Sequence, residues 1–355
     1  MRITVLVGNG FDISLGIKSS YGDFYRWYCA QRSDVKHIRE FRRNIQSRQN
    51  GYFFSMENIW SDFELGLGRY TLNFNSRSAS QFTDCLADAQ KNIADYLRMQ
   101  QNKFSVNIFT EQSLSAFREH LVDFISDLPE AAQRSVLGSI NKHASEDISI
   151  QFITFNYTDS LEKVLAAVPQ NQFTVNKPGL NTHSCRINRS VHHIHGKIGD
   201  LLVLGVDEPY QISNEALRQD LQFKNLMVKA DNITANKQSW HTEAKRRIAD
   251  SKVVCVYGMS LGASDATWWR QLALWLLARS DRHLVLFWYN AQNVRANAHQ
   301  LLTVESVKAK FLEHSYDLSE RQKNEIINRI HVVINTEKFL ALEKKRIMLG
   351  ADLCR

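Results

Sequence analysis

The residues of this chain most suited to chemistry are His195 and Asn156. Imidazole titrates near neutral pH, and His195 stands before a glycine, so its ring has room to act on a ligand as general base or acid. The amide of Asn156 donates and accepts hydrogen bonds, which suits the orientation of a ribose hydroxyl or a water molecule. The alternatives are a histidine satisfied within the core and an ordinary turn or N-cap asparagine.

A glycine turn follows the first apolar stretch of the chain. The β-branched run Ile3–Val7 predicts a buried parallel strand, and it stops at the Gly-Asn-Gly-Phe-Asp sequence of residues 8–12. Gly8 and Gly10 would let backbone N–H groups approach a phosphate, or they only turn the chain from strand to helix. Asp12 would cap the next helix or bond to a ligand hydroxyl. The third glycine of the dinucleotide fingerprint is missing from the sequence.

Four expected strands end in small or polar residues. Since the carboxyl ends of parallel strands meet at one edge of a sheet, we expect the four endings to line one pocket with glycine backbone, an amide, an imidazole and carboxylates. The endings are residues 8–12, 156–159, 193–196 and 258–265. In the last of them, Asp265 either caps the following helix or binds a second hydroxyl.

Two further features near these endings have competing interpretations. His192 and His193 crowd the segment of His195, but no spaced carboxylate or cysteine completes a metal site, so we expect no metal. Trp60 and Glu64 lie one helical turn apart. Glu64 is then either a surface residue of an amphipathic core helix or an extra acid folded over the pocket.

The order of the elements predicts the fold class. Strand, turn and helix alternate from residue 146 onward, which predicts an α/β fold with a Rossmann-like parallel sheet and helices on both faces. The polar stretch Asn171–Arg189, which contains Pro178 and Gly179, is predicted to be a loop. Helical periodicity fills residues 25–145. We therefore expect a nucleotide-binding core (1–24 plus 146–340), a helical insertion (25–145) and a C-terminal tail (341–355).

Composition restricts the partners and the compartment. A net charge of +7 and a pI near 9.1 permit contact with nucleic acid, but the basic residues are dispersed, which is typical of solvated helix faces. The five widely spaced cysteines form neither a disulfide framework nor a CxxC pair, so a reducing cytoplasm is expected. The most apolar helical stretch, residues 268–277, is too short to span a bilayer, and no membrane segment is expected.

Taken together, the motifs resemble the AbiH-type bacteriophage abortive infection proteins. The resemblance runs from Met1 to about Asp265. It is carried by the glycine turn with Gly16-Ile17 and Tyr21–Phe24, by Ile59–Glu64, Thr154–Thr158 and Ile194–Gly196, and by the Gly258-Met-Ser260-Leu sequence. More distantly, the same order is similar to sirtuin-like proteins, some of which cleave NAD in defence. The sequence has no four-cysteine zinc ribbon, which speaks against deacetylation.

The resemblance implies roles for individual residues. Asn156 would position the ribose or the attacking water, and His195 would act as base on a ribose hydroxyl. The resemblance also implies that Gly8, Gly10, Gly258 and Ser260 line the nucleotide. We expect further contacts from the same strand endings, namely from Asn9, Phe11, Asp12, Thr158, Gly196 and Asp265.

Three functional hypotheses follow. The first is a cytoplasmic antiphage defence protein that binds NAD or a related nucleotide and hydrolyses its N-glycosidic bond. The second is a nucleotide-sensing or partner-binding module without turnover, acting through a homo-oligomer or a defence-system partner. The third is a protein that binds or cleaves nucleic acid, which is disfavoured because no paired carboxylates have metal-ligand spacing.

Overall fold

The centre of the molecule is a sheet whose strands are all parallel except one. The computed structural model describes residues 1–45, 60–143, 146–177, 179–290 and 297–343. Within them the strand order is β3-β4-β2-β1-β5-β6-β7, with only β3 antiparallel to its neighbour. The strands are β1 (Arg2–Val7), β2 (Ile148–Thr154), β3 (Gln172–Lys177), β4 (Leu180–His193), β5 (Val253–Tyr257), β6 (His283–Trp288) and β7 (Ile330–Ile334).

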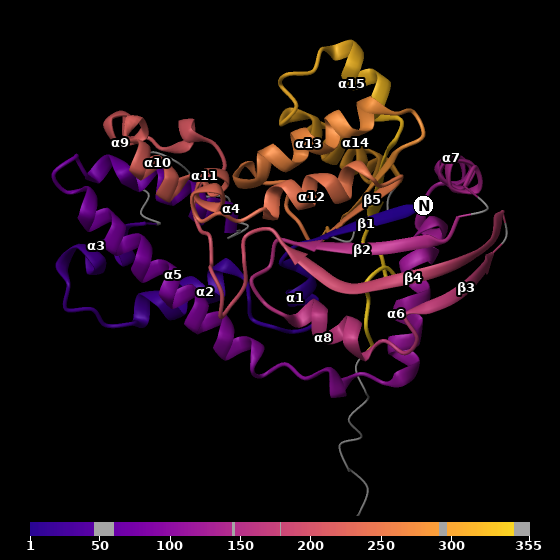
Figure 1. Cartoon of the computed structure of the whole chain (residues 1–355), viewed down its shortest axis with the longest axis horizontal. Coiled ribbons are helices and arrows are strands. Elements are labelled where there is room, and N and C mark those ends of the chain that lie inside the picture. Colours follow the sequence, from indigo (N-terminus) through magenta and orange to yellow (C-terminus); the bar gives the residue numbers. More distant parts are fainter. Residues whose placement is uncertain (46–59, 144–145, 178, 291–296, 344–355) are drawn as a thin grey trace, which may run out of the picture.

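The strand order confirms the predicted α/β, Rossmann-like class. Counted in chain order, the parallel strands run third, second, first, fourth, fifth and sixth across the sheet. This is the order of doubly wound nucleotide-binding folds, in which the order reverses between the first and fourth strands. Here that switch point lies between β1 and β5 (Figure 1).

Helices cover both faces of the sheet and form a separate lobe at one end (Figure 1). The helices are α1 (Gly10–Ser14), α2 (Tyr21–Ala30), α3 (Lys36–Asn44), α4 (Trp60–Tyr70), α5 (Ala79–Gln101), α6 (Glu111–Asp123), α7 (Glu130–Asn141), α8 (Ser160–Ala167), α9 (Glu215–Gln219), α10 (Leu221–Met227), α11 (Lys229–Ala235), α12 (Trp240–Ala249), α13 (Ala266–Ala278), α14 (Asn297–Glu313) and α15 (Glu320–Ile327). A 3-10 turn, η6 (Ala263–Asp265), precedes α13.

Three clusters contain most of the buried apolar side chains of the described residues. Ile3, Val5 and Val7 point to one face of β1 and pack with α6, α7 and α8, whereas Leu6 points to the other face and packs with α12 to α15. The third cluster joins α2 to α5 with α9 and α10, and we call these helices together with α11 the helical lobe. The segment 25–145 thus contributes its first part to the lobe and its last part to the sheet, while the predicted domain division itself stays a prediction.

The prediction of a loop over Asn171–Arg189 is wrong, because this stretch forms β3 and most of β4. The two strands make an antiparallel hairpin at the sheet edge, and their buried residues alternate with exposed ones. His183, Cys185 and Ile187 face inward while their polar neighbours face solvent. An edge strand with one solvated face needs few apolar residues, which explains the polar composition. Pro178 lies outside the described residues.

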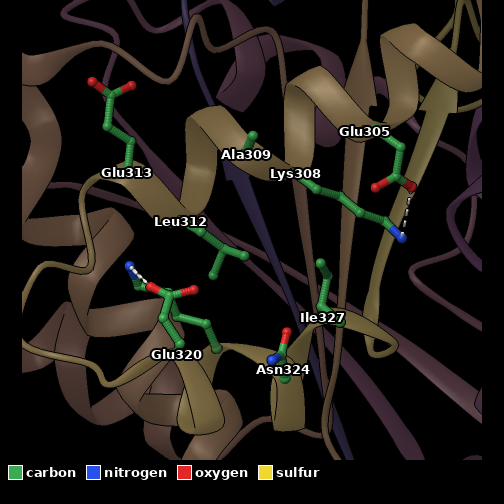
Figure 2. Close-up of a pocket in the computed structure, with 9 residues that line it drawn as sticks. Glu305, Lys308, Ala309, Leu312, Glu313, Glu320, Asn324 and Ile327 are labelled. Carbon is green, nitrogen blue, oxygen red and sulfur yellow. Dashed lines mark hydrogen bonds and ion pairs between the residues drawn. The ribbon is translucent and has the colours of Figure 1, made fainter.

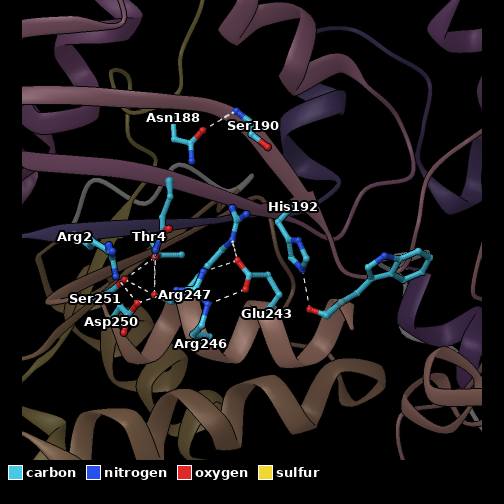
Figure 3. Close-up of polar contacts among 12 residues, drawn as sticks. Arg2, Thr4, Asn188, Ser190, His192, Glu243, Arg246, Arg247, Asp250 and Ser251 are labelled. Atoms are coloured by element: carbon cyan, nitrogen blue, oxygen red, sulfur yellow. Dashed lines mark hydrogen bonds and ion pairs between the residues drawn. The ribbon is translucent and has the colours of Figure 1, made fainter. Parts of the chain in front are cut away.

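A polar network fastens α12 to the sheet (Figure 3). Gln151 on β2 donates from its amide to Thr4 Oγ1 at 2.8 Å and to the carbonyl of Arg247 at 3.1 Å. Thr4 Oγ1 in turn lies 2.6 Å from the hydroxyl of Ser251, which follows the end of α12. Since these groups are largely buried, the bonds fix the helix to the sheet.

The turn after β1 lies directly against the turn after β5. Gly8 N donates to Tyr257 O and Gly10 N to Gly258 O, both at 2.9 Å. A Cβ added to Gly10 would lie 2.5 Å from Gly258 Cα, and one added to Gly8 would lie 2.6 Å from Gly258 O. Since these Gly258 atoms belong to the backbone, they cannot move aside cheaply, and glycine is required for this close approach.

We therefore expect Gly10→Ala to lower the free energy of unfolding by about 1–3 kcal/mol, the usual cost of overpacking a dense region. Denaturant unfolding measures this. The matched control is Gly138→Ala on α7, where nothing lies within 4 Å of an added Cβ. Because glycine weakens a helix interior, the control should gain about 0.5–1 kcal/mol. A Gly10→Ala protein as stable as the wild type would contradict the contact.

Candidate functional site

The first group of predicted site residues gathers around Asp12, whose exposed fraction is 1%. Thr158 donates its hydroxyl to Asp12 Oδ2 at 2.6 Å, and Ser160 donates to the other carboxylate oxygen. Asn156 donates from Nδ2 to Gly8 O at 3.1 Å. Burial raises the pKa of Asp12 to about 6, although the donated hydrogen bonds work against that rise. We call these residues the Asp12 cluster, and it joins the turns after β1 and β2.

Two residues of the glycine turn make their contacts within the chain. Asn9 donates from Nδ2 to Ser19 O at 3.0 Å and accepts from the Ser19 hydroxyl at 2.6 Å. Phe11 is fully buried in the apolar cluster beside β1. Both side chains therefore shape the turn, and their assignment to a ligand stays a prediction.

A second group contains charged side chains buried between the helical lobe and the sheet. Lys229 at the start of α11 is 1% exposed. Its Nζ lies 3.2 Å from Glu64 Oε2 on α4 and 3.0 Å from Asp265 Oδ1 on η6. Tyr157 borders these groups and donates its hydroxyl to Val203 O at 2.9 Å. We call Lys229, Glu64 and Asp265 the buried ion cluster.

The protonation tendencies of the buried ion cluster follow from burial and mutual attraction. Burial opposes the charge of Lys229, but Asp265 and Glu64 outweigh it and raise the pKa of the ammonium group. Burial raises the pKa of Glu64 to about 7, with Lys229 acting in the opposite direction. Glu64 is 6% exposed, so the interpretation of Glu64 as a surface residue is wrong. The side chain of Trp60 lies outside the described residues.

His195 lies beside the buried ion cluster with an unbonded ring nitrogen. Its Nε2 is buried and has no hydrogen-bond partner within the described part of the chain, and it lies 3.9 Å from Asp265 Oδ1. The ring of Phe155 meets the imidazole edge to face, with centroids 5.6 Å apart. Burial first, and the charge of Lys229 second, hold the pKa of His195 well below its usual range. The ring is therefore neutral at physiological pH.

The local backbone explains how His195 is placed. Gly196 has φ +77°, and a Cβ there would lie 1.8 Å from Leu201 O, so only glycine lets the chain reverse after the histidine. His192 donates from Nε2 to Trp240 O at 2.7 Å, which holds the first residue of α12 (Figure 3). His241 then lies beside His195, with ring centroids 6.2 Å apart.

Asp265 occupies the N-cap position of α13, but its side chain makes no capping hydrogen bond. The cap comes from Asp207, whose Oδ2 accepts from Thr267 N at 2.7 Å. The capping interpretation of Asp265 is therefore wrong, and its carboxylate is directed to Lys229 instead. Burial raises the pKa of Asp207 to about 6, and Lys229 works against this.

Sequence reasoning missed Lys229 and Asp207. Asp207 directly follows the apolar run 201–206, the same signal that marked the four strand endings, and could have been found by it. Lys229 carries no such signal, because it stands at an ordinary helix start and its partners are distant in sequence.

The structure brings most of the predicted residues to one edge of the sheet. Phe155, Asn156 and Tyr157 are consecutive at the end of β2, and they connect the Asp12 cluster to His195 and the buried ion cluster. Gly258 joins them through the glycine turn, and Ser260 is half-buried on the same turn after β5. The edge thus carries a neutral imidazole, an amide and ionised groups.

Two cavities lie elsewhere on the molecule. One of about 310 Å³ lies between α14 and α15, lined by residues such as Glu305, Lys308 and Glu320 (Figure 2). Another of about 280 Å³ lies between α14 and the end of β6, with Trp288 and Asn290 in its wall. Neither contains a residue of the predicted site.

The family of this chain is shown by its match to a known family model. The model of the family described as "Bacteriophage abortive infection AbiH" matches residues 4–288. This chain belongs to the AbiH family. The matched region runs from β1 to the end of β6, so it includes both clusters and His195. AbiH membership places the protein among those of antiphage abortive infection, whereas the sirtuin-like resemblance stays a prediction.

No curated protein matches the chain. Within the described residues, no three His, Cys, Asp or Glu side chains are grouped so that they could hold a metal ion. None of the helices in that part of the chain is long and apolar enough to cross a bilayer.

The raised pKa of Asp12 predicts a stability difference that depends on pH. The folded protein holds the Asp12 proton up to about pH 6, whereas the unfolded chain releases it near the ordinary value of 3.8. Asp12 therefore contributes stability below pH 3.8 that is lost as the pH rises through about 6. We expect the unfolding free energy of the wild type minus that of Asp12→Asn to fall by roughly 3 kcal/mol over this interval.

Urea unfolding at several pH values measures this difference. Asp34→Asn, a substitution at an exposed position, is the matched control and should change stability by no more than a few tenths of a kcal/mol. A wild-type minus Asp12→Asn difference that does not vary with pH would refute the assignment of a buried, proton-holding carboxyl.

Proposed function

We propose that this AbiH protein binds NAD or a related nucleotide at the carboxyl edge of its sheet and hydrolyses the N-glycosidic bond. The observation that carries the proposal is the buried His195, whose Nε2 has no partner within the described residues, at the edge where doubly wound folds bind nucleotides. A bound ligand would supply the hydrogen bond that this buried nitrogen lacks within the described chain. Hydrolysis of NAD in the cytoplasm would starve an infected cell.

The proposed reaction needs one base and a stabilising environment. Water adds to C1′ of the ribose, the bond from C1′ to the nicotinamide nitrogen breaks, and its electron pair leaves with nicotinamide. Nicotinamide departs uncharged and ADP-ribose forms. His195, which is neutral, takes the proton directly or through a ribose hydroxyl. Asn156 orients the water or the ribose, and nearby carboxylates favour the positive charge that develops on the sugar.

The residues of the edge differ in what they can offer a nucleotide. The amides of Gly8, Gly10 and Phe11 already donate to main-chain carbonyls. We therefore assign the glycines, with Gly258, to the close packing of the two turns, which sets the backbone course beside the proposed site. Ser260 and Asp265 stand nearer to solvent than His195 does, which suits contacts to hydroxyl groups.

Nucleotide binding without turnover is the second candidate. It is favoured by the way the polar groups satisfy one another, since the Asn156 amide donates to Gly8 O and Asp265 accepts from Lys229. A site whose groups are already paired can hold a ligand without activating water. Both candidates require that the protein binds the nucleotide, and only hydrolysis releases a product.

The test of hydrolysis is release of free nicotinamide from NAD by the purified protein. We expect His195→Ala to lower the rate by at least about 100-fold, because positioned acid–base groups contribute on the order of 10²–10⁴. Asn156→Ala should also lower it. His143→Ala is the control, because His143 follows α7 at the opposite, amino end of the strands, where it pairs with Glu146 at 2.8 Å, and its removal should leave the rate unchanged.

Calorimetry with NAD on the same proteins separates the outcomes. Heat of binding without nicotinamide would establish the sensing candidate in place of hydrolysis. If the protein neither binds NAD nor releases nicotinamide, both candidate functions are overturned. Wild-type rates in His195→Ala and Asn156→Ala would remove the roles assigned to these two residues.

A further inference from the structure

Lys229 holds together parts of the chain that are far apart in sequence. Its Nζ reaches Glu64 on α4 of the helical lobe and Asp265 on η6, within 3.3 Å of three carboxylate oxygens. Glu64 and Lys229 are almost fully buried, so their charges must be compensated within the protein. A buried lysine with two carboxylates fixes the position of each carboxylate.

Asp265 is the group of this ion cluster that faces His195. Because Asp207 caps α13, the Asp265 carboxylate is available to lie between Lys229 and the imidazole. Its Oδ1 is 3.9 Å from Nε2, which is too long for a hydrogen bond but close enough for a strong charge interaction. A lone carboxylate at this distance would favour the protonated imidazolium.

We propose that Lys229 is a positioning residue for His195: its ammonium group fixes the Asp265 carboxylate beside Nε2 and offsets the charge of that carboxylate. The role rests on the proposed function, in which His195 acts as a base. An imidazole that already carries a proton on both nitrogens cannot accept one from water or a ribose hydroxyl.

The groups that face His195 come from several elements. Asp265 lies on η6, Lys229 on α11, His241 on α12 and Phe155 at the end of β2. Burial lowers the pKa of His241 to about 4, so it adds no positive charge at neutral pH. Lys229 is thus the cation that opposes protonation of His195, and Asp265 is the anion that would promote it.

The test measures the protonation state of the His195 ring by NMR. The protein carries no ligand and is isotopically labelled at the Cε1 carbon of its histidines. The His195 signal is identified by its loss in His195→Gln. In the wild type the ring should stay neutral through the range near pH 6.5 in which an ordinary imidazole titrates, because burial holds its pKa well below that range. In Lys229→Gln we expect the pKa of His195 to rise by about 1 to 3, because one compensating charge is lost.

A double variant guards against loss of folding. Lys229→Gln leaves Glu64 and Asp265 without their cation, whereas Lys229→Gln with Glu64→Gln also removes the buried carboxyl group of Glu64. The double variant should also raise the pKa of His195, since Asp265 is again without its cation. Glu64→Gln alone is the matched control, and its His195 should stay neutral because Lys229 still pairs with Asp265.

The outcomes separate this inference from the proposed function. An unchanged His195 titration in the double variant, or an equal rise in Glu64→Gln, would overturn the role of Lys229 whether or not NAD is hydrolysed. Where nicotinamide release is measurable, the acidic limb of its pH profile should move to higher pH in the double variant. Absence of nicotinamide release, with the NMR shift present, would count against the proposed function alone.

Discussion

The close contact of two backbone turns at the switch point of the sheet is the constraint on which the rest of the structure depends. Gly8 and Gly10 after β1 meet Gly258 after β5 at distances that no Cβ permits. Once the two turns are fixed, Asn156 can bond to Gly8 O and the Asp12 cluster can form. The end of β2 is thereby placed so that Phe155 meets the ring of His195.

Charge burial supplies the second constraint. The helical lobe is joined to the sheet domain not only by apolar contacts but also by Lys229 with its carboxylates from α4 and η6. Buried ion pairs are poor sources of stability, since desolvation offsets much of their attraction. Their presence beside a buried imidazole supports the proposed role of His195, because perturbed ionisable groups concentrate at functional sites.

The sequence predicted features that depend on local periodicity and missed those that depend on distant partners. Apolar runs ending at glycine or asparagine predicted the parallel sheet, and the rule that strand ends converge predicted that Asn156, His195 and Gly258 share an edge. The β3–β4 hairpin was missed because an edge strand with a solvated face is polar. Lys229 was missed because a buried lysine is recognisable only when its carboxylates, Glu64 and Asp265, are seen beside it.

The central claim is that the edge at β1 and β5 is a nucleotide site served by His195. The most direct test of this claim is a crystal structure of the protein soaked with ADP-ribose. ADP-ribose is the product of the proposed reaction, so the protein would bind it without converting it. We expect density at the carboxyl ends of β1 and β5, with a ribose hydroxyl in hydrogen-bonding distance of His195 Nε2. Density only in the cavity between α14 and α15, or none at saturating ligand, would contradict it.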